Sequence, residues 1–233
     1  MRLIRSYVKR DGRLTSGQKK ALDKYWNKYG INFDGSQLDL TKIFSRVAPL
    51  IIDIGSGMGD TTIEIASEYP ENNYLSIEVH KPGVGSLLRQ IKNNNLTNIR
   101  IMSHDVVEIL HNSLPDKCID SVYIFFPDPW PKKKHYKRRL INTGFLEILM
   151  KKLKPNARIY ISTDLANYAE QILEVFSNNR HFMNLSTTDN FAPRPRWRPY
   201  TKFELRGKRL GHEIFDFACR YNDKSFYINS AKS

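Results

Sequence analysis

Short apolar runs alternate with amphipathic segments between residues 50 and 179, and this alternation restricts the fold more than any other feature of the sequence. Apolar residues at every second position, or in short continuous runs, indicate strands, whereas recurrence every three or four positions indicates helices. A regular strand–helix alternation is typical of a parallel sheet with helices on both faces. We therefore expect an α/β fold with a doubly wound, mostly parallel sheet. The predicted strands are 50–55, 73–79, 98–105, 118–126 and 157–163, and the predicted helices are 59–70, 83–94, 106–112, 140–154 (ended by Pro155) and 164–179.

Both ends of the chain differ from this central part. Residues 1–40 form a basic N-terminal extension with a predicted helix at 16–29, and residues 190–233 are rich in proline, arginine and aromatic side chains. A length of 233 residues suits a single domain. We therefore expect one domain, 1–233, whose C-terminal segment completes the sheet and contacts the substrate.

The charge balance predicts a polyanionic partner. The formal net charge is +13, and much of the excess is clustered rather than scattered. Nucleic acid is the first candidate and an anionic membrane surface the second. No apolar run is long enough to span a bilayer, and Cys118 and Cys219 lack the spacing of metal ligands. We expect a cytoplasmic protein without a metal and without a membrane anchor, with no required protein partner and a monomer favoured over a homodimer.

Each predicted strand is followed by an acidic residue or a glycine-rich loop. Ligands of doubly wound sheets bind beyond the carboxyl ends of the strands. One acidic residue at a strand end is usually a turn former or a helix cap, but a set in register on one edge indicates a binding site. In chain order the set is Asp53 with Gly55, Gly57 and Gly59, then Glu78, Asp105, Asp128 and Asp164.

The glycine loop argues against a dinucleotide. Gly55, Gly57 and Gly59 have G-x-G-x-G spacing, and Asp60 stands where the dinucleotide fingerprint requires its last glycine. A carboxylate at the start of a helix also opposes a pyrophosphate, which disfavours a nicotinamide oxidoreductase. Glu78 is placed to accept both hydroxyls of a ribose, and Asp105 the amino group of adenine. A nucleoside with a cationic tail fits this set, and the expected cofactor is S-adenosylmethionine, with S-adenosylhomocysteine as product.

The stretch FFPDPWPKKKHYKRR at 125–139 joins a stiff turn to a dense positive charge. Prolines on both sides hold Asp128 outside any helix, and Trp130 can stack on a base or pack on the turn. A ring nitrogen such as guanine N7 needs orientation but no deprotonation before methylation, and a fixed carboxylate complements the positive charge that develops on the ring. Asp128 is thus the predicted catalytic residue. The predicted phosphate contacts are Lys133, Lys134, Lys137, Arg138 and Arg139.

Several segments together resemble the bacterial tRNA (guanine-N7-)-methyltransferases over nearly the whole chain. They are GRLTSGQ at 12–18, IGSGMG at 54–59, IEVHKPGVG at 77–85, HD at 104–105, FFPDPWPKKKHYKRR at 125–139, STD at 162–164 and RPYTKFELRGKRLGH at 198–212. The resemblance implies the Rossmann-like class I methyltransferase fold and methylation of guanosine 46 in the variable loop of tRNA. It also implies cofactor contacts at Asp53, Glu78, Asp105 and Asp128. Substrate contacts would be Lys132, Asp164, Thr201, Lys202, Phe203 and Glu204. The chain departs from the family's pattern at Asp53, where glutamate is commoner, and at Pro131, where histidine is.

Two other functions remain open from the sequence alone. One is an S-adenosylmethionine-dependent RNA methyltransferase that acts on another atom or another RNA. The other is an RNA-binding module that kept the fold and lost catalysis, although the intact acidic residues at the strand ends argue against such decay.

Overall fold

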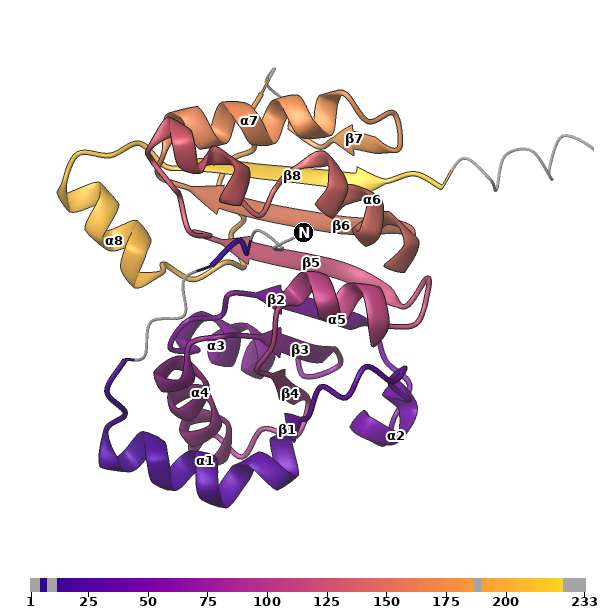
Figure 1. The fold of residues 1–233 in the computed structure, drawn as a ribbon, viewed down its shortest axis with the longest axis vertical. Coiled ribbons are helices and arrows are strands. Elements are labelled where there is room, and N and C mark those ends of the chain that lie inside the picture. The colour runs from indigo at the N-terminus through magenta and orange to yellow at the C-terminus, as the bar shows by residue number, and fades with distance from the viewer. Residues whose placement is uncertain (1–4, 8–11, 187–189, 224–233) are drawn as a thin grey trace, which may run out of the picture.

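The computed structural model describes residues 5–7, 12–186 and 190–223. Within these residues the strands form one eight-stranded sheet in the order β1-β4-β3-β2-β5-β6-β8-β7 (Figure 1). The parallel strands are β1 (Gly30–Ile31), β2 (Leu50–Ile54), β3 (Asn73–Ile77), β4 (Ile99–Met102), β5 (Ile119–Phe125) and β6 (Leu153–Thr163). The C-terminal part supplies β8 (Phe215–Tyr221), which pairs antiparallel with β6 and with β7 (Phe182–Asn184). The expected doubly wound sheet is confirmed, and the strand order reverses direction between β2 and β5.

Helices cover both faces of the sheet and create two apolar cores. One core involves α1 (Ser16–Tyr29), α3 (Asp60–Glu68) and α4 (Lys81–Asn93). The other involves the short α2 (Leu40–Phe44) with α5 (Val106–Asn112), α6 (Thr143–Lys152) and α7 (Ala166–Ser177). The side chains of a strand alternate between faces, so Leu50, Ile52 and Ile54 enter the second core whereas Ile51 enters the first.

One predicted helix end is wrong. Pro155 does not end the helix that precedes it, because α6 ends at Lys152 and β6 already begins at Leu153. Pro155 therefore lies inside a strand, where its missing N–H would interrupt a regular ladder. The pairing of β5 with β6 shifts register between Ile119 and Ser121, and this irregularity accommodates the proline.

The edge where the parallel strands end is flanked by α8 (Lys202–Arg209). In Figure 1 the heads of β5 and β6 point toward the side of the molecule on which α8 lies, while β8 points the other way. No helix in the described ranges is both long and apolar enough to cross a membrane.

A candidate active site at the carboxyl ends of the strands

A cavity of about 350 Å³ lies at the switch point between β2 and β5. Its lining includes Gly55, Gly57 and Glu78 from the strand ends, Asp128 from the turn after β5, and Phe203 from α8. These five were all expected as site residues, and the fold brings them together from segments far apart in the sequence.

Glu78 holds the glycine loop in place. One of its carboxylate oxygens accepts a hydrogen bond from the Gly57 N–H at 2.7 Å, and the other accepts from the His80 N–H at 2.7 Å. Burial raises the pKa of Glu78, and these backbone hydrogen bonds partly oppose that shift. The loop also lies close against the first turn of α4, where only glycine fits, because a Cβ at Gly83 would stand 2.3 Å from the Gly57 carbonyl oxygen. Each carboxylate oxygen keeps a lone pair that can accept from a ligand hydroxyl.

Asp53 is not among the residues that line the cavity. It is buried, and its carboxylate accepts a hydrogen bond of 2.5 Å from the Thr62 hydroxyl in α3. Burial raises the pKa of Asp53 to about 6, and the nearby Glu78 carboxylate adds to the shift. The geometry thus gives Asp53 a part in fixing α3 against β2, and the cofactor contact expected of it stays a prediction.

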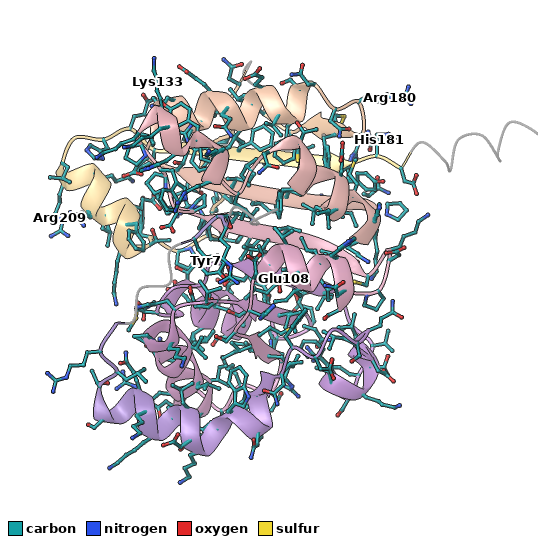
Figure 2. All side chains as sticks on the ribbon, viewed as in Figure 1. Tyr7, Glu108, Lys133, Arg180, His181 and Arg209 are labelled. Carbon is teal, nitrogen blue, oxygen red and sulfur yellow. The ribbon has the colours of Figure 1, made fainter. Side chains whose placement is uncertain are left out.

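Asp105 serves as the cap of α5, because its side chain accepts from the Val107 N–H at 2.9 Å. It lines a neighbouring cavity of about 360 Å³ that shares Ser6 with the first one. Ser6 and Tyr7 both line the first cavity, and no feature of the basic N-terminal sequence indicated this. Figure 2 shows Tyr7 near Glu108 at the middle of the molecule. Burial raises the pKa of Tyr7, and the carboxylates of Asp105 and Glu108 add to the shift.

Asp128 lies on an exposed turn whose ends have unusual backbone angles. Phe126 has φ +54° and Trp130 has φ +43°, a left-handed conformation that is unfavourable for residues with a side chain. Trp130 packs on the turn: its indole N–H donates to the Ser6 carbonyl at 2.9 Å, and Arg138 lies over its ring at 4.8 Å. Of the two roles considered for Trp130, the structure therefore favours packing over base stacking.

The basic run after the turn divides into exposed and buried members. Lys133, Lys134 and Lys137 in the 3-10 helix η1 (Lys133–Arg138) are exposed, as is Lys132 before it, and Arg138 is half-buried. The predicted phosphate contact of Arg139 is wrong, because its side chain is only 1% exposed. Figure 2 shows Lys133 and Arg209 on the side of the molecule where β5 and β6 end, and Arg180 and His181 at the opposite side.

The TKFE segment, 201–204, begins α8, and its members have different surroundings. Phe203 lines the cavity, and the Lys202 ammonium pairs with Asp60 at 2.6 Å, next to the glycine loop. Thr201 is the cap of α8 and accepts from the Glu204 N–H at 3.0 Å.

Glu204 is neither solvated nor turned toward the cavity. It is 1% exposed and pairs with the Arg198 guanidinium at 2.6 Å. Arg198 also donates to both oxygens of Asp216, at 3.0 and 3.1 Å. Arg198 thus takes up the Glu204 carboxylate, whereas the substrate contact that the resemblance implies for Thr201 stays a prediction.

Asp164 follows β6 and is half-buried. Its carboxylate contacts the His212 ring nitrogen at 3.2 Å. The alternative role as a helix cap is wrong, because the cap position of α7 is Leu165, which has no side-chain cap. The side chain lies beside Gly207 of α8 and is not among the residues that line the cavity.

Comparisons with known proteins agree with this architecture. Residues 47–217 match a family model described as putative methyltransferase. The chain is 52% identical over 219 residues to the tRNA (guanine-N(7)-)-methyltransferase of Nitrosospira multiformis, covering 94% of this chain and 95% of that protein. It is 51% identical to the protein of the same name from Chromobacterium violaceum, covering 94% and 96%.

Solved structures match in fold alone. The 16S rRNA methyltransferase KamB superposes with a TM-score of 0.55 at 10% identity, over 81% of this chain and 95% of that chain. The aminoglycoside resistance methyltransferase NpmB1 gives a TM-score of 0.52 at 13% identity, over 78% and 92%. The family model spans most of the chain, and relatives of about 50% identity cover almost its full length. Together with the class I methyltransferase fold, this shows that the chain belongs to the bacterial tRNA (guanine-N7-)-methyltransferase family.

Proposed function

We propose that this protein transfers the methyl group of S-adenosylmethionine to N7 of a guanine in tRNA, the target within the tRNA being guanosine 46 of the variable loop. The observation that carries the proposal is the cavity at the switch point, where Gly55, Gly57 and Glu78 lie opposite Asp128. Family membership supports the substrate class, and the position of each residue at the cavity supports the role proposed for it.

The residues around the cavity fit the cofactor. Glu78 is buried and keeps acceptor capacity for a ribose diol, and the neighbouring Gly57 brings the backbone close. Asp105 caps α5 through one oxygen, so the other can accept from the adenine amino group. S-adenosylmethionine, when bound, supplies an electrophilic methyl group on a sulfonium. Asp60 at the start of α3 places a carboxylate next to the glycine loop, where it pairs with Lys202.

Asp128 supplies electrostatic stabilisation rather than proton transfer. Glu78 and Asp105 would hold S-adenosylmethionine, which would give its methyl group to the N7 lone pair and leave as the neutral thioether, so no proton would need to be moved. Positive charge therefore moves onto the guanine ring. A carboxylate fixed on a stiff turn stabilises this charge without reorganising, which is the usual source of large electrostatic rate effects. Alignment of the donor and acceptor supplies the remainder.

The tRNA is held from the side where β5 and β6 end. The exposed lysines of η1 and the basic residues of α8 flank the cavity and contact phosphates. Asp164 accepts from the N1–H and N2–H edge of the guanine, and a base held at that edge must leave its tertiary contacts. Such an enzyme would act in the cytoplasm, as a monomer.

Product analysis with an Asp128 variant tests the proposal. The wild-type protein is incubated with labelled S-adenosylmethionine and unmodified tRNA, and the nucleosides are then separated. We expect 7-methylguanosine, and Asp128→Asn should lower the single-turnover rate about a hundredfold or more. Label in any other nucleoside would reject the proposed reaction, and a wild-type rate in Asp128→Asn would reject the role of that carboxylate.

A further inference from the structure

Arg139 is a buried cation whose hydrogen bonds are all made inside the protein. Its Nε donates to the Pro129 carbonyl oxygen at 3.0 Å. Its Nη1 donates to the Asn167 carbonyl oxygen at 3.1 Å and to the Gln171 Oε1 at 2.9 Å, and its Nη2 to the Asn167 Oδ1 at 2.5 Å. These partners are neutral, so the cost of desolvating the charge is offset by hydrogen bonds to uncharged oxygen atoms rather than by a carboxylate.

The Pro129 carbonyl is next to Asp128, on a turn that needs external support. The residues at its two ends, Phe126 and Trp130, both adopt the left-handed backbone conformation, which is unfavourable for residues with a side chain. The Phe126 N–H donates to the Ser162 carbonyl at 2.8 Å, and the Trp130 indole donates to Ser6. Proline has no N–H, so the carbonyl is the only backbone group of Pro129 that can form a hydrogen bond. Arg139 donates that hydrogen bond.

The other end of the Arg139 guanidinium is anchored on a rigid element. Asn167 and Gln171 lie one turn apart on α7, which begins directly after the Asp164 segment. The guanidinium also lies over the rings of Tyr136 at 3.7 Å and Tyr168 at 4.7 Å. Burial raises the pKa of Tyr168 to about 12; Arg139 opposes this shift and the Asp128 carboxylate adds to it, so both charges act on the same ring.

We infer that Arg139 is a positioning residue that fixes the Asp128 turn to α7. The inference rests on the proposed function, because it assigns to Arg139 the placement of the Asp128 carboxylate against the reacting guanine. The planar fork of arginine suits this role, since it bonds the turn and the helix at once, whereas a lysine at the same place reaches one of them. Arg139 and the exposed Lys137, close in sequence, thus have different functions.

The test separates positioning from phosphate binding. Arg139→Lys and Arg139→Gln are compared with Lys137→Gln, a lysine of η1 in the same basic run, and with Arg180→Gln, an exposed arginine at the opposite side of the molecule. For each, the single-turnover methylation rate is measured at saturating tRNA and cofactor and normalised to folded protein. The tRNA dissociation constant is measured over a range of salt concentrations.

We expect both Arg139 variants to lose about 10- to 100-fold in the saturated rate, the scale of a 1 Å misplacement, with the tRNA affinity and its salt slope unchanged. Lys137→Gln should lower the salt slope by about 0.7–0.9, and Arg180→Gln should change neither quantity. A role in folding alone would lower the folded fraction and leave the normalised rate intact.

A variant at a partner of Arg139 tests the same inference if the Arg139 variants do not fold. Asn167 is exposed, so Asn167→Ala should fold while removing one acceptor of the guanidinium, and we expect a several-fold lower saturated rate. A wild-type normalised rate in Arg139→Lys overturns the inference and leaves the proposed function intact. If the Arg139 variants are unfolded, a wild-type normalised rate in Asn167→Ala has the same consequence. So does a reduced salt slope in Arg139→Lys. A wild-type protein that methylates no guanine N7 refutes the proposed function and this inference with it.

Discussion

Replacing Arg198 by methionine would leave the buried carboxylates of Glu204 and Asp216 without their shared partner. Arg198 is 0% exposed, Glu204 1% and Asp216 6%. The Ser162 hydroxyl also donates to Asp216, so the cluster joins the start of α8 to the last residues of β6 and the first residues of β8. Methionine keeps the length of the side chain and limits cavity formation, so the change in the free energy of unfolding reports mainly on the lost charge.

The expected magnitude follows from the burial of the pair. Removing one partner from a buried ion pair costs about 3–5 kcal/mol, because an uncompensated charge remains. In a chain of this size that corresponds to a fall of about 6–20 °C in Tm. Glu204→Gln should cost only about 1 kcal/mol, because Arg198 and Asp216 remain paired and the amide oxygen can still accept from Arg198.

The dependence on pH gives a second check. Burial raises the pKa of Asp216 even with Arg198 present, and removing the guanidinium raises it further. A carboxyl group whose pKa is higher in the folded than in the unfolded state stabilises the fold while protonated, and that contribution is lost as pH rises. The cost of Arg198→Met should therefore be smaller near about pH 5 than near about pH 8.

Urea unfolding at both pH values, followed by far-UV circular dichroism, measures these differences. Wild-type stability of Arg198→Met at the higher pH would show that the two carboxylates do not depend on the guanidinium. An equal cost of Glu204→Gln and Arg198→Met would show that the two carboxylates do not share one cation.

Two further changes test the carboxylates at the strand ends. Asp53→Asn should raise the free energy of unfolding at about pH 7.5 by up to roughly 3 kcal/mol. The reason is that the pKa of Asp53 is raised to about 6, so wild type loses stability as pH rises from about 4 to 6. Equal unfolding curves for both proteins above pH 6 would contradict this. Glu78→Ala should weaken S-adenosylmethionine binding by about 1–3 kcal/mol in calorimetry, and an unchanged affinity in the folded variant would remove Glu78 from the cofactor site.

The sequence was sufficient for the central sheet because its strands are short, apolar and regularly separated by amphipathic helices. It was insufficient where tertiary contacts decide the role of a side chain. Arg138 and Arg139 are equivalent in the sequence, yet the turn of η1 leaves Arg138 against Trp130 and buries Arg139 against α7. Likewise, Glu204 pairs with Arg198, and Arg198 also holds Asp216 on another element, so the local pattern of α8 gave no indication of the buried cluster.

The acidic residues at the strand ends differ in whether the alternation of the strand constrains their side chains. Side chains alternate along a strand, so Asp53, two positions after Ile51, must share the face that Ile51 presents to α3 and α4 rather than the open end of the sheet. Glu78 comes after the last residue of β3 and is free of that constraint. Asp128 is further from its strand and is placed by prolines and by Arg139. The distance of a carboxylate from the end of its strand thus separates the residue that supports the fold, Asp53, from the two that reach the cavity.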